Sequence, residues 1–167
     1  MTFRVVSMAE EHIEGFRAVL DSVSRERRYL TFLEAPSLEE SRKFVRRNIR
    51  EGYPQCVALV EEQVVGWCDI LPIDRPTRAH CGVLGVGVLA EFRGRGIGTE
   101  LLRATLEKAR AAGLTRIELS VREHNKQVVA LYERFGFVLE GLQRNAVRVD
   151  GKYENLICMG LLLEQAI

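Results

Sequence analysis

Residues 83–103, VLGVGVLAEFRGRGIGTELLR, join an apolar run, a glycine-rich turn and the start of an amphipathic helix. Residues 83–89 are rich in β-branched side chains and predict a buried strand, although Gly85 and Gly87 interrupt it. From Thr99 onward, apolar side chains recur at helical spacing. Glycines let backbone N–H groups approach a phosphate closely, and a helix N-terminus supplies unpaired donors. The stretch therefore predicts a site for a phosphorylated ligand.

The glycine spacing distinguishes three kinds of phosphate-binding turn. A P-loop is not expected, because no lysine follows the glycines. A dinucleotide fingerprint needs G-x-G-x-x-G, whereas Gly94, Gly96 and Gly98 stand two apart. Glu118 nevertheless lies about twenty residues further on, where a ribose-binding acid would stand, so dinucleotide binding stays open as an alternative. The third pattern, R-x-x-G-x-G, is matched by Arg93 together with Gly96 and Gly98.

Length and composition are those of one globular domain over residues 1–167, with 47% hydrophobic residues. The net charge of +1 gives no reason to expect nucleic acid or an anionic membrane as a partner. No apolar run approaches the roughly 20 residues that span a bilayer, and residues 1–4 lack the order of a signal peptide. The four cysteines and three histidines show no metal-ligand spacing. We therefore expect a cytoplasmic protein with reduced cysteines and no metal.

The remaining patterns predict the order β-α-α-β-β-β-α-β-α-β-β, which is typical of a mixed sheet with helices on its faces. Capping-box spacings at Ser7 and at Ser37 predict the starts of the first two helices. The other helices are expected to begin near Thr99 and Asn125. Strands are expected at residues 3–6, 55–60, 64–71, 79–89, 115–121, 137–149 and 153–163.

The second of these helices combines an apolar and a strongly basic face. Its expected inward residues are Phe44, Val45 and Ile49. Its basic residues are Arg42, Lys43, Arg46, Arg47 and Arg50. Attraction of an acidic substrate is one interpretation, but a solvated helix face is favoured because charges usually line exposed helix surfaces.

From about residue 79 to the C-terminus, the motifs resemble those of the GNAT superfamily of N-acetyltransferases. Residues 93–98 resemble the acyl-CoA pyrophosphate loop, and residues 125–137, NKQVVALYERFGF, resemble the family segment N-x-x-A-x-x-L-Y-E-x-x-G-F. Val128 replaces the usual small residue. Residues 149–155, VDGKYEN, are similar to the final hairpin of polyamine and ribosomal-protein acetyltransferases. The resemblance implies a mixed α/β fold, with a mostly antiparallel central sheet, a splayed strand pair and about four flanking helices.

The resemblance also implies acetyl-CoA as acyl donor. A bulge at Gly85 and Gly87 would splay the strand so that pantetheine lies in the gap. Freed N–H groups near Val88 would then hold the developing oxyanion. The implied cofactor-binding residues are Val86, Gly87, Val88, Arg93, Gly94, Arg95, Gly96, Ile97, Gly98, Thr99, Asn125 and Tyr132.

Asn125 and Tyr132 lie seven residues apart and share one helix face. By resemblance, Asn125 anchors pantetheine and Tyr132 protonates the departing thiolate. From position alone, Tyr132 would be a core aromatic and Asn125 a helix cap. No base is assigned: Val83 stands where many relatives have a glutamate, and the candidates are Asp69, His80, Glu118, Glu123 and His124.

The resulting expectation is an N-acetyltransferase that acts by direct transfer in a ternary complex. Its acceptor would be a primary amine on a small molecule or at a protein N-terminus, in a pocket formed by residues 24–36 and 72–78. The resemblance also suggests a homodimer. The alternative from another class is a non-catalytic acyl-CoA-binding sensor on the same fold.

Overall fold

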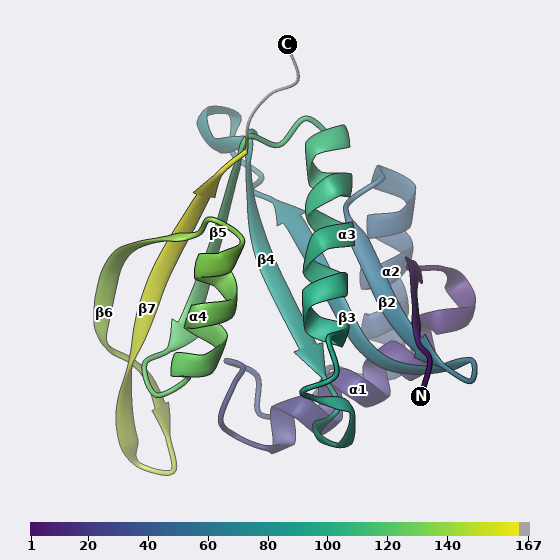
Figure 1. The fold of residues 1–167 in the computed structure, drawn as a ribbon, viewed down its shortest axis with the longest axis horizontal. Helices are drawn as coiled ribbons and strands as arrows, with labels where there is room; N and C mark the ends of the chain where they lie inside the picture. The colour runs from purple at the N-terminus through teal and green to yellow at the C-terminus, as the bar shows by residue number, and fades with distance from the viewer. Residues whose placement is uncertain (164–167) are drawn as a thin grey trace.

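All seven strands form one sheet in the computed structural model, which describes residues 1–163 (Figure 1). The strand order is β1-β2-β3-β4-β5-β7-β6, and β4–β5 is the one parallel neighbour pair within these residues. The strands are β1 (Arg4–Ser7), β2 (Gln55–Val60), β3 (Gln63–Pro72), β4 (Cys81–Val88), β5 (Arg116–Arg122), β6 (Val138–Val149) and β7 (Lys152–Leu162). The α-helices are α1 (Ile13–Arg25), α2 (Leu38–Glu51), α3 (Ile97–Ala111) and α4 (Lys126–Arg134). The predicted element order and mixed sheet are confirmed.

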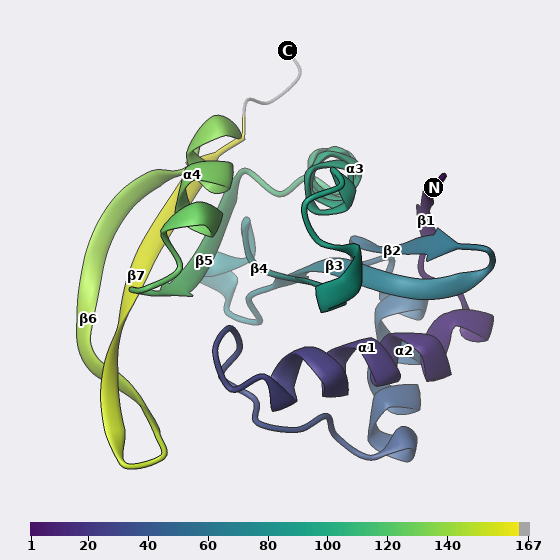
Figure 2. The ribbon, with the colours of Figure 1, turned by 60° about the horizontal axis from the view of Figure 1, so that its bottom comes forward.

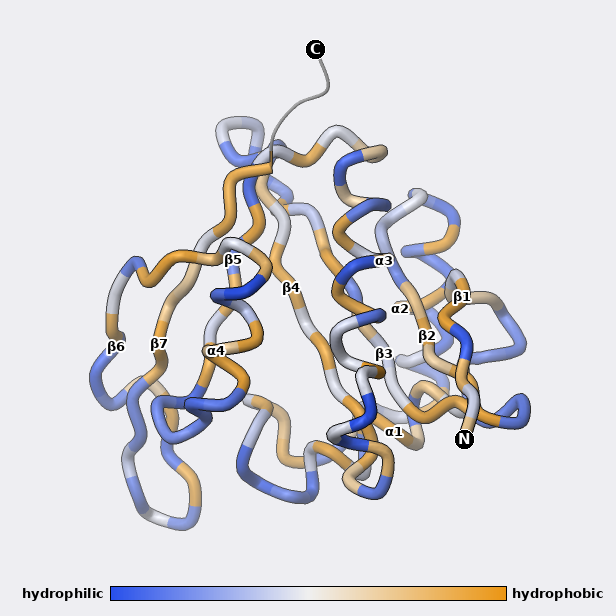
Figure 3. The backbone as a smooth tube through the Cα atoms, in the orientation of Figure 1, coloured by the Kyte–Doolittle hydropathy of each residue, from blue (hydrophilic) through white to orange (hydrophobic). Residues whose placement is uncertain are grey.

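Helices cover both faces of the sheet, with α1 and α2 on one side and α3 and α4 on the other (Figure 2). Side chains alternate between these faces along β3. The Trp67 ring lies edge-on to Phe16 of α1 at 5.7 Å between centroids, whereas the α-carbon of Gly66 faces Leu101 of α3. Because both faces are covered, the central strands are apolar over most of their length (Figure 3).

The sheet divides between β4 and β5. These parallel strands pair only through residues 81–83 and 116–118, after which β4 continues to Val88 and β5 to Arg122 without pairing to each other. Figure 1 shows the two strands diverging from this point. The predicted splayed pair is therefore confirmed.

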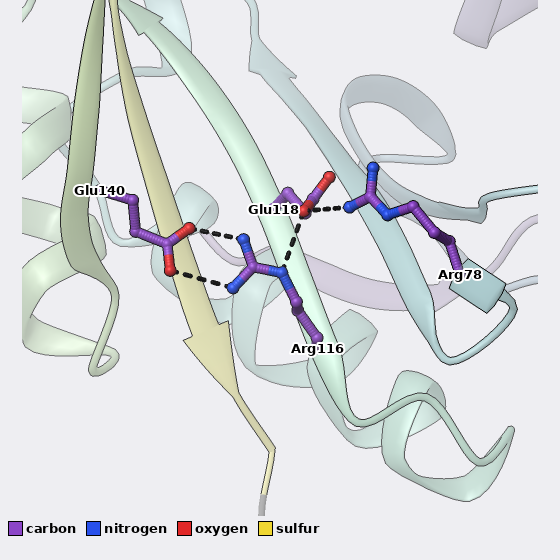
Figure 4. A network of polar contacts seen from close by, with 4 residues as sticks. All are labelled: Arg78, Arg116, Glu118 and Glu140. Carbon is purple, nitrogen blue, oxygen red and sulfur yellow. Dashed lines mark hydrogen bonds and ion pairs between the residues drawn. The ribbon is translucent and has the colours of Figure 1, made fainter.

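A polar network reinforces the closed end of this division (Figure 4). Arg116 of β5 holds Glu140 of β6 through two hydrogen bonds of 2.9 and 2.5 Å. Its Nε also donates to Glu118 at 3.0 Å, and Glu118 accepts a further bond from Arg78, which precedes β4. The four side chains join β6, β5 and the entry to β4 where the divided strands still pair.

The glycines of β4 do not form the predicted bulge, so that prediction is wrong. Residues 82–88 pair with residues 66–72 of β3 in unbroken register. Gly87 is instead explained by close approach, because a β-carbon there would lie 2.3 Å from the Trp67 ring. A β-carbon at Gly85 would lie 3.1 Å from Oδ1 of Asp69. The splay arises on the other side of β4, where β5 turns away.

One of the two predicted capping boxes is present. The Glu40 N–H donates to Ser37 Oγ at 3.2 Å, and the Ser37 N–H donates to Glu40 Oε2 at 3.0 Å, at the start of α2. The box at Ser7 is wrong, because Ser7 ends β1 and pairs with Cys56. A 3-10 turn over Glu10–His12 leads into α1 instead.

The two faces of α2 separate largely as predicted. Val45 is fully buried, but Ile49 is 44% exposed and does not belong to the inward face. On the basic face, Arg42, Lys43 and Arg46 each lie within ion-pair distance of a glutamate and remain exposed. The favoured interpretation, a solvated face, is confirmed.

Candidate functional site

A cavity of about 1420 Å³ opens where the sheet divides. It is lined by residues of β3, β4, α1, α2, the first turn of α3 and α4, by residues 28–32 and Pro36, and by a few residues of β5 and β7. The proposed cofactor-binding residues that line it are Val86, Gly87, Val88, Arg93, Gly94, Gly96, Ile97, Gly98, Thr99, Asn125 and Tyr132. Arg95 is the exception: its guanidinium lies outside, 5.8 Å from the Phe92 ring centroid.

The turn before α3 presents a row of free backbone donors. Within the described part of the chain, the N–H groups of residues 94–99 donate to no backbone or side-chain acceptor. Gly94 and Gly96 adopt positive φ values of 75° and 84°, and Gly96 occupies the N-cap position of α3. Such N–H groups and the positive end of the helix dipole together suit a diphosphate.

The side chain of Arg93 serves this turn structurally. Its Nε donates to the Val88 carbonyl at 2.9 Å, and its Nη2 lies 2.9 Å from the Glu26 carboxylate. The guanidinium also lies 4.7 Å from the centroid of the Tyr29 ring. Arg93 therefore fixes the turn against the end of β4 and against residues 26–29.

The side of β4 that faces the division carries unpaired backbone groups. The Leu89 N–H donates to the Val65 carbonyl at 2.9 Å, which fixes the alternation of the antiparallel ladder. By that alternation, the N–H groups of Val86 and Val88 point away from β3, where β5 offers no partner. They can bind the amides and carbonyl of an extended ligand. The backbone N–H and C=O of Gly87 face β3, so Gly87 can contact a ligand in the division but cannot form a hydrogen bond with it.

Helix α4 brings Asn125 and Tyr132 to the same cavity. Tyr132 is buried, its ring packs against Phe137 at 5.6 Å between centroids, and its hydroxyl donates to no described residue. Burial raises the pKa of the Tyr132 phenol above its ordinary value, so the proton is retained at neutral pH. Asn125 occupies the N-cap position without a side-chain capping bond, and its Nδ2 donates to the Arg28 carbonyl at 3.4 Å.

The α1/α2 side of the cavity forms a largely apolar chamber around the Asp69 carboxylate. Its walls include Phe16, Phe44, Trp67, Leu71 and Val83. Asp69 is 8% exposed and makes no hydrogen bond or ion pair with another described side chain. Burial raises the pKa of Asp69 to about 7, because the charged form is removed from water.

Only some of the predicted acceptor walls and base candidates line the cavity. Residues 28–32 and Pro36 line the chamber, whereas none of residues 72–78 does. Glu118 is held by two arginines and lies outside the cavity, as do His80 and Glu123. His124 lines the cavity with its Nδ1 3.8 Å from Glu154. Of the five candidates, Asp69 is the one inside the apolar chamber.

Sequence analysis missed the structural role of Arg122. Its place in an alternating strand predicted the polar face, but the side chain is 1% exposed. It donates to the carbonyls of Arg27 at 2.7 Å and Leu30 at 2.6 Å, and lies 3.3 Å from Glu154. Arg122 thereby holds the segment that walls the chamber. The carbonyl partners lie more than 90 residues away along the chain, so no local pattern reveals them.

Three further features of the described residues concern disulfide bonds, metal binding and membrane-spanning helices. Cys56, Cys68 and Cys81 are buried, Cys158 is half-buried, and all four thiols are free. Residues 1–163 contain no cluster of three or more His, Cys, Asp or Glu side chains that could hold a metal ion. None of their helices has the length and apolar character needed to cross a membrane.

Comparison with known proteins identifies the family. The acetyltransferase (GNAT) family model matches residues 16–137, and the chain belongs to this family. It is therefore an N-acetyltransferase whose acyl donor is acetyl-CoA. The dinucleotide-binding alternative is set aside.

The relatives include two enzymes named for amino-acid substrates. The chain is 29% identical to the L-amino acid N-acetyltransferase AaaT of Escherichia coli, over 75% of this chain and 78% of the relative. It is 32% identical to an L-methionine sulfoximine/L-methionine sulfone acetyltransferase of Pseudomonas paraeruginosa, over 69% and 68%. A Salmonella typhimurium acetyltransferase structure with acetyl-CoA has a TM-score of 0.93 at 15% identity, covering 100% of this chain and 97% of that one. This last similarity concerns the fold.

Proposed function

We propose that this enzyme acetylates the primary amine of a small molecule with an apolar side chain, by direct transfer in a ternary complex. One observation carries the proposal: a single cavity joins the free donors of residues 94–99 to the apolar chamber around Asp69. Donor and acceptor can therefore meet at the division of the sheet. The names of the two amino-acid acetyltransferases support an acceptor of this kind.

In this proposal, the donor occupies the cavity in an extended form. The N–H groups of residues 94–99 hold the diphosphate, and the side chain of Arg93 keeps their turn in place. The free backbone groups of Val86 pair with the pantetheine arm, which Asn125 also contacts. The thioester carbonyl then lies at the Val88 N–H.

The proposed chemistry needs no acyl-enzyme. The neutral amine attacks the thioester carbonyl carbon, and the Val88 N–H stabilises the oxyanion as the C–N bond forms. When the C–S bond breaks, Tyr132 gives its phenolic proton to the departing sulfur. No cysteine stands among the described residues that line the cavity, which supports transfer without a covalent intermediate.

The cellular setting belongs to the same proposal. Four free cysteines fit the reducing cytoplasm, where we place this single-domain enzyme. A homodimer is predicted by resemblance alone, and light scattering after size-exclusion chromatography would measure the mass.

The proposal is tested by measuring CoA thiol release with a panel of amines. The panel contains L-methionine sulfone, L-phenylalanine, spermidine and a peptide with an N-terminal alanine, beside a calorimetric titration with acetyl-CoA. We expect acetyl-CoA to bind and an apolar amino acid to give the fastest release. Release with the peptide alone would move the acceptor to a protein N-terminus. Binding without release would favour the sensor, and absence of binding would refute the proposed donor site.

A further inference from the structure

Asp69 occupies a position that the proposed transfer leaves without a role. It lies in β3 opposite Gly85, three residues before Val88 on the neighbouring strand. Its side chain shares the α1/α2 face with Trp67, two residues earlier. Gly85 leaves room for the carboxylate, since a β-carbon there would lie 3.1 Å from Oδ1. The carboxylate thus lies against the strand whose free side would hold the acyl group.

The elements packed around Asp69 provide no countercharge. The chamber walls from α1 are apolar, and Gln55 of β2, directly opposite, is uncharged. Burial also raises the pKa of the adjacent Cys68 thiol, which keeps it neutral. An ion pair therefore does not explain why the Asp69 carboxylate is buried at this position.

Glu40 of α2 and Arg28 are the charged groups that the other walls bring to the chamber around Asp69. Glu40 of α2 accepts the hydrogen bond from the Ser37 backbone. Arg28 lies 5.8 Å from the centroid of Tyr29, and neither side chain bonds to Asp69. Asp69 is therefore left free to interact with a ligand that enters the chamber.

We propose that Asp69 is the general base that removes a proton from the acceptor ammonium before transfer. The inference rests on the proposed function. Three residues along a strand span about 10 Å, a distance bridged by the carbonyl carbon, the amine nitrogen and one water. A cationic amine is also drawn to the Asp69 carboxylate, because no described cationic side chain pairs with it and its surroundings are largely apolar.

The proton balance is complete with Asp69 and Tyr132. The ammonium gives one proton to the Asp69 carboxylate and becomes a neutral amine, which forms the C–N bond. Tyr132 protonates the sulfur when the C–S bond breaks, and the second amine proton replaces the one that Tyr132 gives. The products are the amide and the CoA thiol, and the proton on Asp69 returns to solvent.

The test is Asp69→Asn, assayed with saturating acetyl-CoA and L-methionine sulfone as the probe acceptor between pH 5.5 and 9. For the wild-type protein, we expect kcat/KM to rise with pH and to level off above about 7, as Asp69 loses its proton. Asp69→Asn should lower the plateau on the order of 10²-fold and remove this inflection. Calorimetry should show acetyl-CoA affinity unchanged within about twofold, because the donor groups are untouched.

Asp74→Asn is the matched control, because Asp74 is exposed and lies outside the cavity. It should keep the wild-type profile. If Asp69→Asn fails to fold, Gly85→Ala displaces the carboxylate and should shift the inflection while acetyl-CoA still binds. An unchanged rate and profile in Asp69→Asn or, failing that, in Gly85→Ala would overturn the role of Asp69 while the proposed function stands. Absence of transfer by the wild-type protein, with all panel amines, would overturn the proposed function as well.

Discussion

At the scale of single residues, the ring and the hydroxyl of Tyr132 have different roles, one in packing and one in the proposed chemistry. The ring is buried against Phe137 and contributes to the core, whereas the hydroxyl bonds to no described residue and Tyr132 is among the residues that line the cavity. A core aromatic and a proton donor are therefore compatible in one side chain. Removing the oxygen alone tests the second role and leaves the first in place.

Tyr132→Phe should lower turnover on the order of 10²-fold, because the thiolate would leave without a positioned acid. Acetyl-CoA affinity should stay within about twofold, since the donor-binding groups are unchanged. Thiol release and calorimetry measure the two quantities. Tyr153→Phe is the control, because Tyr153 is 58% exposed and outside the cavity. Equal turnover in both variants would remove Tyr132 from the mechanism.

At the scale of elements, α3 carries a glycine with φ of 84° at each end. Gly96 precedes the helix and lines the cavity, whereas Gly113 follows the helix far from the donors. A β-carbon added at either glycine would meet no atom of the described residues within 4 Å, so only backbone strain opposes alanine. Comparing alanine variants of Gly96 and Gly113 therefore distinguishes an effect on stability from an effect on acetyl-CoA binding.

Gly96→Ala and Gly113→Ala should each lower the free energy of unfolding by about 1–2 kcal/mol, because alanine disfavours positive φ. Only Gly96→Ala should also weaken acetyl-CoA binding, by at least about tenfold, because the strain at residue 96 would displace the N–H groups of the proposed diphosphate site. Chemical denaturation and calorimetry measure the two effects. Equal acetyl-CoA affinity in the two variants would contradict the placement of the diphosphate at this turn.

Elements with local causes were predictable from sequence. The cap at Ser37, the left-handed Gly52 that ends α2 and the Asp150–Gly151 turn each depend on a few consecutive residues. The failures depend on distant partners. Gly87 is required by the close approach of the Trp67 ring on the next strand. Buried Arg122 donates hydrogen bonds to carbonyls of residues more than 90 positions away in the sequence.

The same distinction applies to the candidate site. The motifs at residues 93–99 and in α4 each consist of consecutive residues, and the structure brings both segments, except Arg95, to one cavity. Asp69 was only one candidate among five, because its isolation is created by β2, β4, α1 and α2 together. The role of such a residue follows from three-dimensional surroundings that no spacing in the sequence records.

At the scale of the whole molecule, the divided sheet joins two parts through a short stretch of pairing. Residues 81–83 and 116–118 provide the strand pairing, and the network of Figure 4 supports it. Beyond this stretch, the backbone of β4 alternates between bonded and free groups. That alternation gives a residue-by-residue test of where the donor lies.

Amide hydrogen exchange should distinguish neighbouring residues of β4. Without ligand, the N–H groups of Val86 and Val88 should exchange faster than those of Gly85 and Gly87, which point toward β3. Acetyl-CoA should slow exchange at Val86 and Val88 and leave the two glycines nearly unchanged. Two-dimensional NMR resolves the four amides. An equal change in exchange at all four amides on adding acetyl-CoA, or no change at Val86 and Val88, would argue against pantetheine pairing along this strand.

The division also means that this enzyme carries an open β-edge in the middle of its sheet rather than at its rim. Open edges template pairing with other chains, and proteins usually blunt them with charges or bulges. Here β4 keeps its regular pairing with β3 and its apolar character along the open edge, up to Val88. The substrate itself would then act as the protective strand, so the supply of acetyl-CoA would govern resistance to aggregation as well as the rate of catalysis.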